Sequence, residues 1–380
     1  MVYSTSFWEN ETYLKKVDYA IIGSGIVGLN AALQLKILDT KAQVLLIDRA
    51  AIPQGASTKN AGFACFGSPT ELLDDLRSHS RMEVWDLVQE RWEGLQKLRT
   101  KLGDRSLDYC HYGGYELFRA TEKGTFEDCL AHLEEMNQAF EQISGEKNVF
   151  QVQDAKIRAF GFQGVQHLIA SKIEGQLHPA KMVEALQQLC GAANVSCLYG
   201  LATEQVENRA NEVVIHCRNG WKLKARKVLI ATNGFAKSLL PKLNLLPARN
   251  QVLVTKSIPN LAFKGCFHYD RGYFYFRNIG NRVLLGGGRN LALKVEQSDQ
   301  FGQTDLIQKA LIDLLENLIL PKQYFEIEQW WSGILGIGVQ KKPIVKMVDD
   351  RIGVAVRLGG MGVAIGTSVG ERAAKMLAIG

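Results

Sequence analysis

The sequence predicts a mixed α/β protein with two parts, one built around a parallel sheet and one around an antiparallel sheet with helices. Three observations support this fold class. Residues 17–22 are an apolar run followed by closely spaced glycines and an apolar helical segment, 26–38, the pattern of a strand, a tight turn and a helix. Alternating apolar runs within residues 266–288 indicate antiparallel strands. Amphipathic patterns predict helices at 121–143 and 304–319.

Length and charge narrow the class of protein. A chain of 380 residues with 46% hydrophobic residues has the composition of a globular protein of about two domains. The net charge of +6 comes from 45 basic and 39 acidic residues scattered along the chain, without a long Lys/Arg run. We therefore expect no nucleic-acid partner.

The seven cysteines are odd in number, widely spaced and never arranged as CxxC, which favours reduced thiols over disulfides or a metal site. The first residues lack a basic start followed by an apolar core, and no run of about 18 apolar residues occurs. The expectation is a cytoplasmic protein without a metal or a membrane span.

The strongest local signal is the glycine motif between the first strand and its helix. Gly23 permits a tight turn, Gly25 lets the backbone approach a pyrophosphate, and Gly28 lets the helix pack against the strand. The next predicted strand, 42–48, ends in Asp48, where a carboxylate can accept hydrogen bonds from ribose hydroxyls. This combination predicts a Rossmann-type dinucleotide site, with a structural glycine turn as the alternative. NAD and FAD both remain open at this point.

The loop "GASTKNAGFACFG", residues 55–67, discriminates between these cofactors. A simple NAD domain would continue with alternating strands and helices, whereas this chain enters a run of small residues and then a long helical stretch, 71–102. Small side chains let a flat ring system lie along the backbone, with peptide N–H groups available to its polar atoms. The loop favours a flavin, with a flexible Gly/Ser loop as the alternative.

Further segments carry a family resemblance in the right order. These are the residues 174–189, 227–236, 330–336 and 357–377, together with the glycine motif. The chain resembles the FAD-dependent oxidoreductases that include D-amino-acid oxidase, glycine oxidase, monomeric sarcosine oxidase and γ-glutamylputrescine oxidoreductase. The amine-oxidising branch is the most similar, because its "GASGRNGG" loop resembles residues 55–62 and its lead-in often holds a pair like Trp8-Glu9.

The resemblance implies a fold, a reaction and a set of cofactor contacts. It implies a Rossmann-type FAD-binding domain from residues 1–75, 150–240 and 330–380, and a substrate domain from 76–149 and 241–329. The implied reaction oxidises a C–N bond in a small amine or amino acid by hydride transfer to the flavin, giving an imine that hydrolyses. The implied FAD contacts are Gly23, Gly25, Ile26, Val27, Gly28, Asp48, Arg49, Ser57, Lys59, Asn60, Ala61, Gly62, Thr203, Ala231, Thr232, Gly234, Gly359, Gly360, Met361, Gly362 and Val363.

Departures from the family pattern matter as much as the matches. Some relatives attach flavin covalently through a cysteine on the strand or a histidine in the loop. Here residues 331–336 contain no cysteine, and Asn60 occupies the histidine position, so we expect non-covalent FAD. The strand position of an arginine that grips a substrate carboxylate holds Leu335. Either Arg277 or Arg289 replaces that arginine, or the substrate has no carboxylate.

The remaining assignments concern the pocket and the electron acceptor. Tyr273 and Trp331 are candidate pocket walls, although aromatic side chains on alternating strands usually belong to the core. His178 before Pro179 is expected to cap a helix. In sarcosine-oxidising relatives a lysine near the flavin promotes reaction with oxygen, and the strand that would carry it reads Leu284-Leu285 here. The electron acceptor is therefore either O2 or another molecule. The alternatives are a dehydrogenase subunit that needs a partner acceptor and a flavin-dependent RNA-modifying enzyme.

Overall fold

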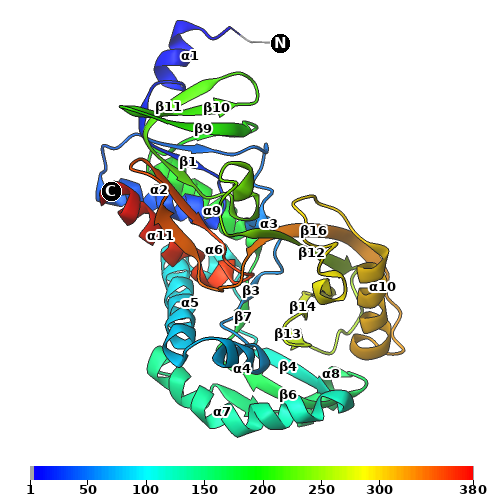
Figure 1. Cartoon of the computed structure of the whole chain (residues 1–380). Helices are drawn as coiled ribbons and strands as arrows, with labels where there is room; N and C mark the ends of the chain where they lie inside the picture. The colour runs from blue at the N-terminus through cyan, green and yellow to red at the C-terminus, as the bar shows by residue number, and fades with distance from the viewer. Residues whose placement is uncertain (1–3, 380) are drawn as a thin grey trace.

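Two eight-stranded sheets organise the computed structural model, which describes residues 4–379 (Figure 1). The first sheet holds five neighbouring parallel strands, as the glycine motif predicts, with antiparallel strands beside them. Its order is β17 (Ile344–Met347), β18 (Ile352–Val356), β11 (Lys222–Ile230), β1 (Val17–Ile22), β2 (Val44–Ile47) and β8 (Ser196–Leu198), with β10 (Glu212–Cys217) beside β11 and β9 (Thr203–Arg209) beside β10.

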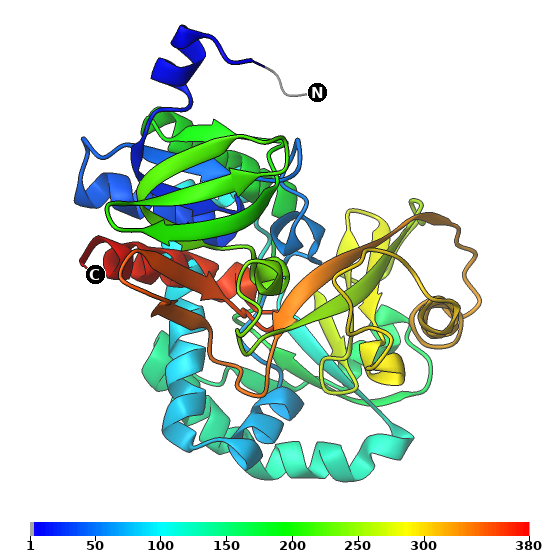
Figure 2. The ribbon, with the colours of Figure 1, turned by 45° about the horizontal axis from the view of Figure 1, so that its top comes forward.

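The first sheet is covered on both faces, which explains the continuous apolar run of β1. Tyr19 and Ile21 pack in the cluster formed with α2 (Ile26–Leu38), α9 (Pro179–Ala192) and α11 (Gly362–Ile379). Val17 and Ile22 belong to the opposite cluster, together with apolar residues of β10 and β11. Figure 2 shows the antiparallel strands that extend from β11 in front of this sheet.

The second sheet contains the predicted antiparallel strands. Its order is β16 (Ile327–Ile337), β12 (Leu246–Thr255), β15 (Arg282–Gly287), β14 (Phe274–Ile279), β13 (Cys266–Tyr269), β4 (Gly114–Arg119), β6 (Val165–Ser171) and β5 (Phe150–Val152). Phe267 and Phe276 stack at 4.6 Å between ring centroids in its core, under α8 (Ala155–Phe160) and α10 (Asp305–Leu314). A small sheet of β3 (Phe63–Ala64) and β7 (Gly175–Gln176) lies between the two large sheets.

The helices follow the predicted patterns with one correction. The helical stretch expected at 71–102 is two helices, α4 (Pro69–Ser78) and α5 (Arg81–Leu102), because Ser80 and Glu83 form a capping box that starts the second one. The expected helices at 121–143 and 304–319 correspond to α7 (Lys123–Ser144) and to α10 with the π-turn Leu315–Ile319. Three short helices complete the set: α1 (Phe7–Thr12), α3 (Ala56–Lys59) and α6 (Asp104–Leu107).

Strand pairing departs from the predicted domain segments at two places. Strands β5 and β6, within 150–171, belong to the second sheet, although the resemblance assigned 150–240 to the cofactor domain. Strand β16 also belongs to the second sheet, although 330–380 was assigned to the cofactor domain. Strands β6 and β16 join the second sheet through β4 and β12, which are distant in sequence, so short motifs do not reveal their sheet. The division into domains stays a prediction.

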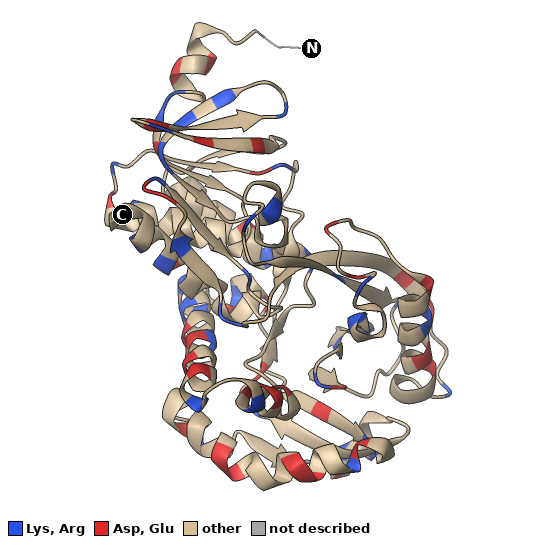
Figure 3. Ribbon diagram, viewed as in Figure 1, with Lys and Arg blue, Asp and Glu red and all other residues tan. Residues whose placement is uncertain are grey.

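Charges of both signs are distributed over the molecule (Figure 3). Within residues 4–379 no helix is long and apolar enough to cross a bilayer. All seven cysteines are free thiols.

Candidate active site

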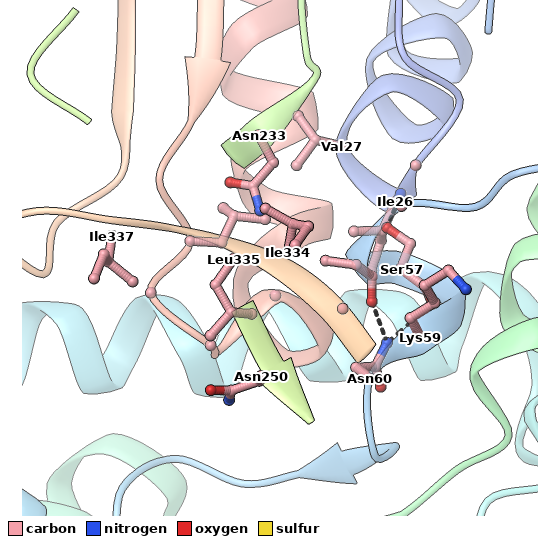
Figure 4. A pocket seen from close by; sticks show the side chains of 18 of the residues that line it. Ile26, Val27, Ser57, Lys59, Asn60, Asn233, Asn250, Ile334, Leu335 and Ile337 are labelled. Carbon is pink, nitrogen blue, oxygen red and sulfur yellow. Dashed lines mark hydrogen bonds between the residues drawn. The ribbon is translucent and has the colours of Figure 1, made fainter. Parts of the chain in front are cut away.

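A single large cavity of about 1020 Å³ connects the glycine motif to the second sheet. It begins at the carboxyl end of β1, where ligands bind in open α/β sheets. From there it continues past α3 to β12, β14 and β16. Figure 4 shows Ser57, Lys59 and Asn60 on one side of it and Ile334 and Leu335 of β16 on the other. Two regions that are far apart in sequence therefore share one cavity.

The glycines at the nucleotide end are required by close packing. A Cβ on Gly28 would collide with the carbonyl oxygen of Gly23, so the helix can approach this turn so closely only without a side chain at residue 28. Gly23 has φ +109, which L side chains rarely adopt. A Cβ on Gly25 would lie 2.8 Å from Ser57 Oγ and would fill the space beside the first turn of α2. The motif thus leaves a cradle of exposed backbone at a helix N-terminus, where phosphates bind.

Unpaired polar atoms at this end fit a nucleotide. The Oγ1 atoms of Thr203 and Thr232 are buried, line the cavity and have no partner among residues 4–379. Asp48 Oδ2 accepts hydrogen bonds from the backbone N–H and the hydroxyl of Ser24, at 2.9 and 2.7 Å. The Arg49 guanidinium lies 3.8 Å from the ring centroid of Phe235. The glycine cradle and these orphan hydroxyls fit FAD.

Hydrogen bonds fix the small-residue loop against the glycine motif. Ser57 Oγ accepts from the backbone N–H of Ile26 at 2.9 Å. The side-chain nitrogen of Asn60 donates to the carbonyls of Ala56 and Ser57, both at 2.9 Å, and its Oδ1 accepts from Gly62 N–H at 2.7 Å. Asn60 therefore closes the turn that ends α3. The loop is a rigid wall rather than a flexible Gly/Ser segment.

The opposite end of the cavity is lined by side chains of the second sheet. Tyr273 and Tyr275 line it, and the Arg289 guanidinium lies 5.9 Å from the ring centroid of Tyr273. Burial raises the pKa of Tyr275 to about 12, so its hydroxyl stays a neutral donor. Asn250 also lines this end, and its buried Oδ1 has no partner among residues 4–379. These groups can orient a small polar molecule.

Two of the four predicted pocket residues do not line the cavity. Arg277 donates from Nε to the carbonyl of Ala61 and from Nη2 to that of Leu177 at 3.1 Å, so it ties the loop to the start of α9. Trp331 donates from Nε1 to the Lys59 carbonyl at 3.0 Å. Both predictions of a substrate contact need this correction, because the backbone already engages these donors.

Most of the predicted cofactor residues come together on one surface. The following line the cavity: Gly23, Gly25, Ile26, Val27, Asp48, Arg49, Ser57, Lys59, Asn60, Ala61, Thr203, Ala231, Thr232, Gly359, Gly360, Met361, Gly362 and Val363. Gly28, Gly62 and Gly234 do not line it. A Cβ on Gly62 would collide with the carbonyl of Leu177, and one on Gly234 would lie 2.5 Å from that of Leu335. These three glycines shape the wall from behind.

Sequence reasoning missed several lining residues at the sheet end. His268 of β13, Glu71 of α4 and Asn250 of β12 line the cavity from three separate elements. No motif or spacing connects them, because strand pairing brings them together. His178 behaves as predicted: its Nδ1 accepts from Lys181 N–H at 3.2 Å and caps α9.

Comparisons with known proteins agree with the fold and the cradle. Residues 18–376 match the family described as FAD dependent oxidoreductase. A probable oxidoreductase OrdL of Rhizobium meliloti is 25% identical over 375 residues, covering 95% of this chain and 83% of that protein. Glycine oxidase from Geobacillus kaustophilus superimposes with a TM-score of 0.76 at 17% identity, covering 96% of this chain and 95% of that one.

A second solved structure shares the same fold. L-proline dehydrogenase from P. horikoshii superimposes with a TM-score of 0.74 at 15% identity, covering 96% of this chain and 94% of the other. The family match spans both sheets and the cavity between them. This chain belongs to the family of FAD-dependent oxidoreductases, and FAD is its cofactor.

Proposed function

We propose that the protein oxidises the C–N bond of a small amine or amino acid. The observation that carries this proposal is the single cavity of about 1020 Å³, which joins a nucleotide cradle to a polar and aromatic end. The printed names of the similar structures, glycine oxidase and L-proline dehydrogenase, support an amino-acid or amine substrate.

The cofactor would be held by the glycine cradle and the loop 55–62. Bound FAD would supply the acceptor for a hydride from the carbon next to the substrate nitrogen. Hydride transfer requires no side chain to remove a proton from that carbon, so the protein contributes orientation and a water-poor site. The absence of cysteine from 331–336 and the structural role of Asn60 support non-covalent binding.

The substrate would lie between the loop and the second sheet. Tyr273, Tyr275 and Asn250 would orient its polar group. Leu335 lines the cavity where relatives carry an arginine, so a carboxylate would be held by Arg289, the cation beside Tyr273. The bonds of Arg277 to the backbone carbonyls of Ala61 and Leu177 support Arg289 over Arg277 in this role. A neutral or basic amine would need no such cation.

Anaerobic mixing tests the proposed reaction. FAD-loaded protein would be mixed with D-amino acids, N-methylated glycines, polyamines and γ-glutamyl amines while the oxidised-flavin absorption is followed. The proposal predicts bleaching by at least one of these classes. Absence of bleaching by every class would overturn it. Acid precipitation provides a separate test, because yellow colour in the pellet would contradict non-covalent binding.

A further inference from the structure

A buried ion pair lies at the sheet end of the cavity. His268 of β13 is 4% exposed, Glu174 is 1% exposed, and the ring Nε2 is 2.9 Å from Glu174 Oε2. His268 lines the cavity, and its ring meets that of Phe63 edge-on at 5.4 Å. Nδ1 has no hydrogen-bond partner among residues 4–379. A buried charge pair is costly to desolvate, so packing alone does not explain its position beside the cavity.

A second buried carboxylate lies next to this histidine. Strands β4 and β13 run parallel and pair Glu116 with His268, so both side chains point to the same face from strands about 4.8 Å apart. Glu116 is 2% exposed and accepts hydrogen bonds from Ser68 Oγ at 2.9 Å, from Thr70 N–H at 3.0 Å and from Thr70 Oγ1. Hydroxyl groups donate or accept, so they satisfy Glu116 in either protonation state.

The two residues face two different cavities. His268 lines the main cavity, whereas Glu116 lines a second one of about 500 Å³ between α4, β4 and the start of α7. Asp74 and Arg271 line both, so the wall between the cavities is thin. The rim of the second cavity includes Arg77 and Asp128, whose side chains are 60% and 41% exposed. It therefore opens toward solvent.

We propose that His268 and Glu116 form a proton route from the substrate cavity through the second cavity to solvent. The proposal rests on the proposed amine oxidation, in which a substrate that enters as an ammonium ion must lose one N–H proton before its hydride leaves. With substrate and flavin in the main cavity, the second cavity would give this proton a separate exit to solvent.

The transfer balances without any further reactant. No direct hydrogen bond joins His268 to Glu116 within residues 4–379, so the Nδ1–H bond of the imidazolium breaks and its proton crosses a bridging water to the Glu116 carboxylate. Neutral His268 then accepts the proton of the substrate ammonium, whose N–H electron pair stays on nitrogen. Glu116 releases its proton to water in the second cavity. One proton has moved outward, and both residues have returned to their starting states.

The surroundings raise the pKa of both residues above the values of the free side chains. Burial disfavours the charged ring, but the attraction and hydrogen bond of Glu174 outweigh it and raise the pKa of His268 to about 9. Burial raises the pKa of Glu116 to about 7, against the lowering effect of its Thr70 hydrogen bonds and of His268. The other charged groups around the two residues are Glu71, Asp74, Arg77, Glu122, Asp128, Asp270 and Arg271.

Infrared titration of the FAD-loaded protein without substrate tests the coupling directly. We expect a buried carboxylic-acid band that disappears with a midpoint near pH 7 and is absent from Glu116→Gln. In His268→Gln the midpoint should move to higher pH, because a neighbouring positive charge is lost. Glu296→Gln is the matched control, a buried glutamate bonded to Arg249 outside both cavities. An unchanged midpoint in His268→Gln would overturn the proposal.

Rapid anaerobic mixing with a reducing amine gives the kinetic test. At pH 7 we expect Glu116→Gln to slow flavin reduction by about 10- to 100-fold, and Glu116→Asp to restore part of the rate. A wild-type rate in Glu116→Gln would refute the route. The double variant His268→Gln/Glu174→Gln removes both charges if the single histidine variant misfolds. If no amine reduces the flavin, the proposed function fails, whereas the infrared titration still decides the coupling.

Discussion

At its nucleotide end the cavity is walled by main chain and small side chains, whereas at its sheet end it is walled by large side chains from several strands and α4. The first kind of wall depends on the absence of Cβ atoms at a few consecutive positions. The second depends on which strands pair and in which register. The cofactor end is therefore encoded by local sequence, whereas the shape of the sheet end is encoded by the tertiary fold.

The largest effect on FAD affinity is expected at the nucleotide end of the cavity. Gly28→Ala puts a methyl group into the Gly23 carbonyl, which should cost about 3 kcal/mol and weaken FAD binding roughly 100-fold. Quenching of flavin fluorescence on binding would measure this. Gly55→Ala is the control in the neighbouring loop, because nothing lies within 4 Å of its added Cβ. Equal affinities for the two variants would show that close packing does not form the cradle.

Arg277 connects the two walls, and its removal should act on stability. Arg277→Met leaves the buried carbonyls of Ala61 and Leu177 without their donor, at a cost of about 2–4 kcal/mol in the free energy of unfolding. Urea denaturation of the FAD-loaded protein measures it. The relative rates for acidic and neutral substrates should not change. A selective loss of acidic substrates would return Arg277 to the pocket.

Arg289 provides the opposite test at the sheet end. Arg289→Met should leave the free energy of unfolding almost unchanged, because its cation–π contact with Tyr273 is worth about 0.5–1 kcal/mol. Reducing substrates with a carboxylate should bind about 10- to 100-fold more weakly, since a charge-assisted hydrogen bond is lost. Substrates without a carboxylate should keep their affinity. Kd values from anaerobic reduction traces would separate these cases, and an equal loss for both classes would contradict the assignment.

The buried pair at the sheet end gives a pH-dependent stability. The pKa of His268 is raised from 6.5 to about 9 on folding, so the native state holds this proton more tightly than the unfolded chain. Its stabilising contribution is complete below pH 6.5 and is lost as pH rises toward 9. Urea denaturation at several pH values should show this decline in the wild type. Parallel curves for the wild type and His268→Gln/Glu174→Gln would contradict it.

The smallest effect is expected at Trp331. Trp331→Phe removes the hydrogen bond to the Lys59 carbonyl and keeps an aromatic ring, which should cost about 1 kcal/mol. FAD affinity should fall by less than about 10-fold, and substrate preference should stay the same. FAD-binding titrations of Trp331→Phe and Gly28→Ala would show which substitution lowers the affinity more. A change in substrate preference would mean that the indole ring contacts substrate.

The nucleotide end of the cavity can be predicted from the sequence, whereas the sheet end cannot, and the reason is physical. Gly23, Gly25 and Gly28 are close together in the sequence and shape a single strand–turn–helix segment, so their spacing alone indicates the cradle. His268 and Glu116 are separated by 152 residues and meet only because β4 pairs with β13. Arg277 was misassigned for the same reason, because its position on a strand does not reveal which carbonyls it meets.

The crystal structure of the FAD-loaded protein tests the two-ended cavity most directly. We expect the pyrophosphate at the N-terminus of α2, beside Gly25 and Ser57, and the flavin ring between the loop 57–62 and β16. We also expect open space next to Tyr275 for a substrate. A flavin ring at Arg49 and Phe235, with adenine against the second sheet, would contradict this arrangement.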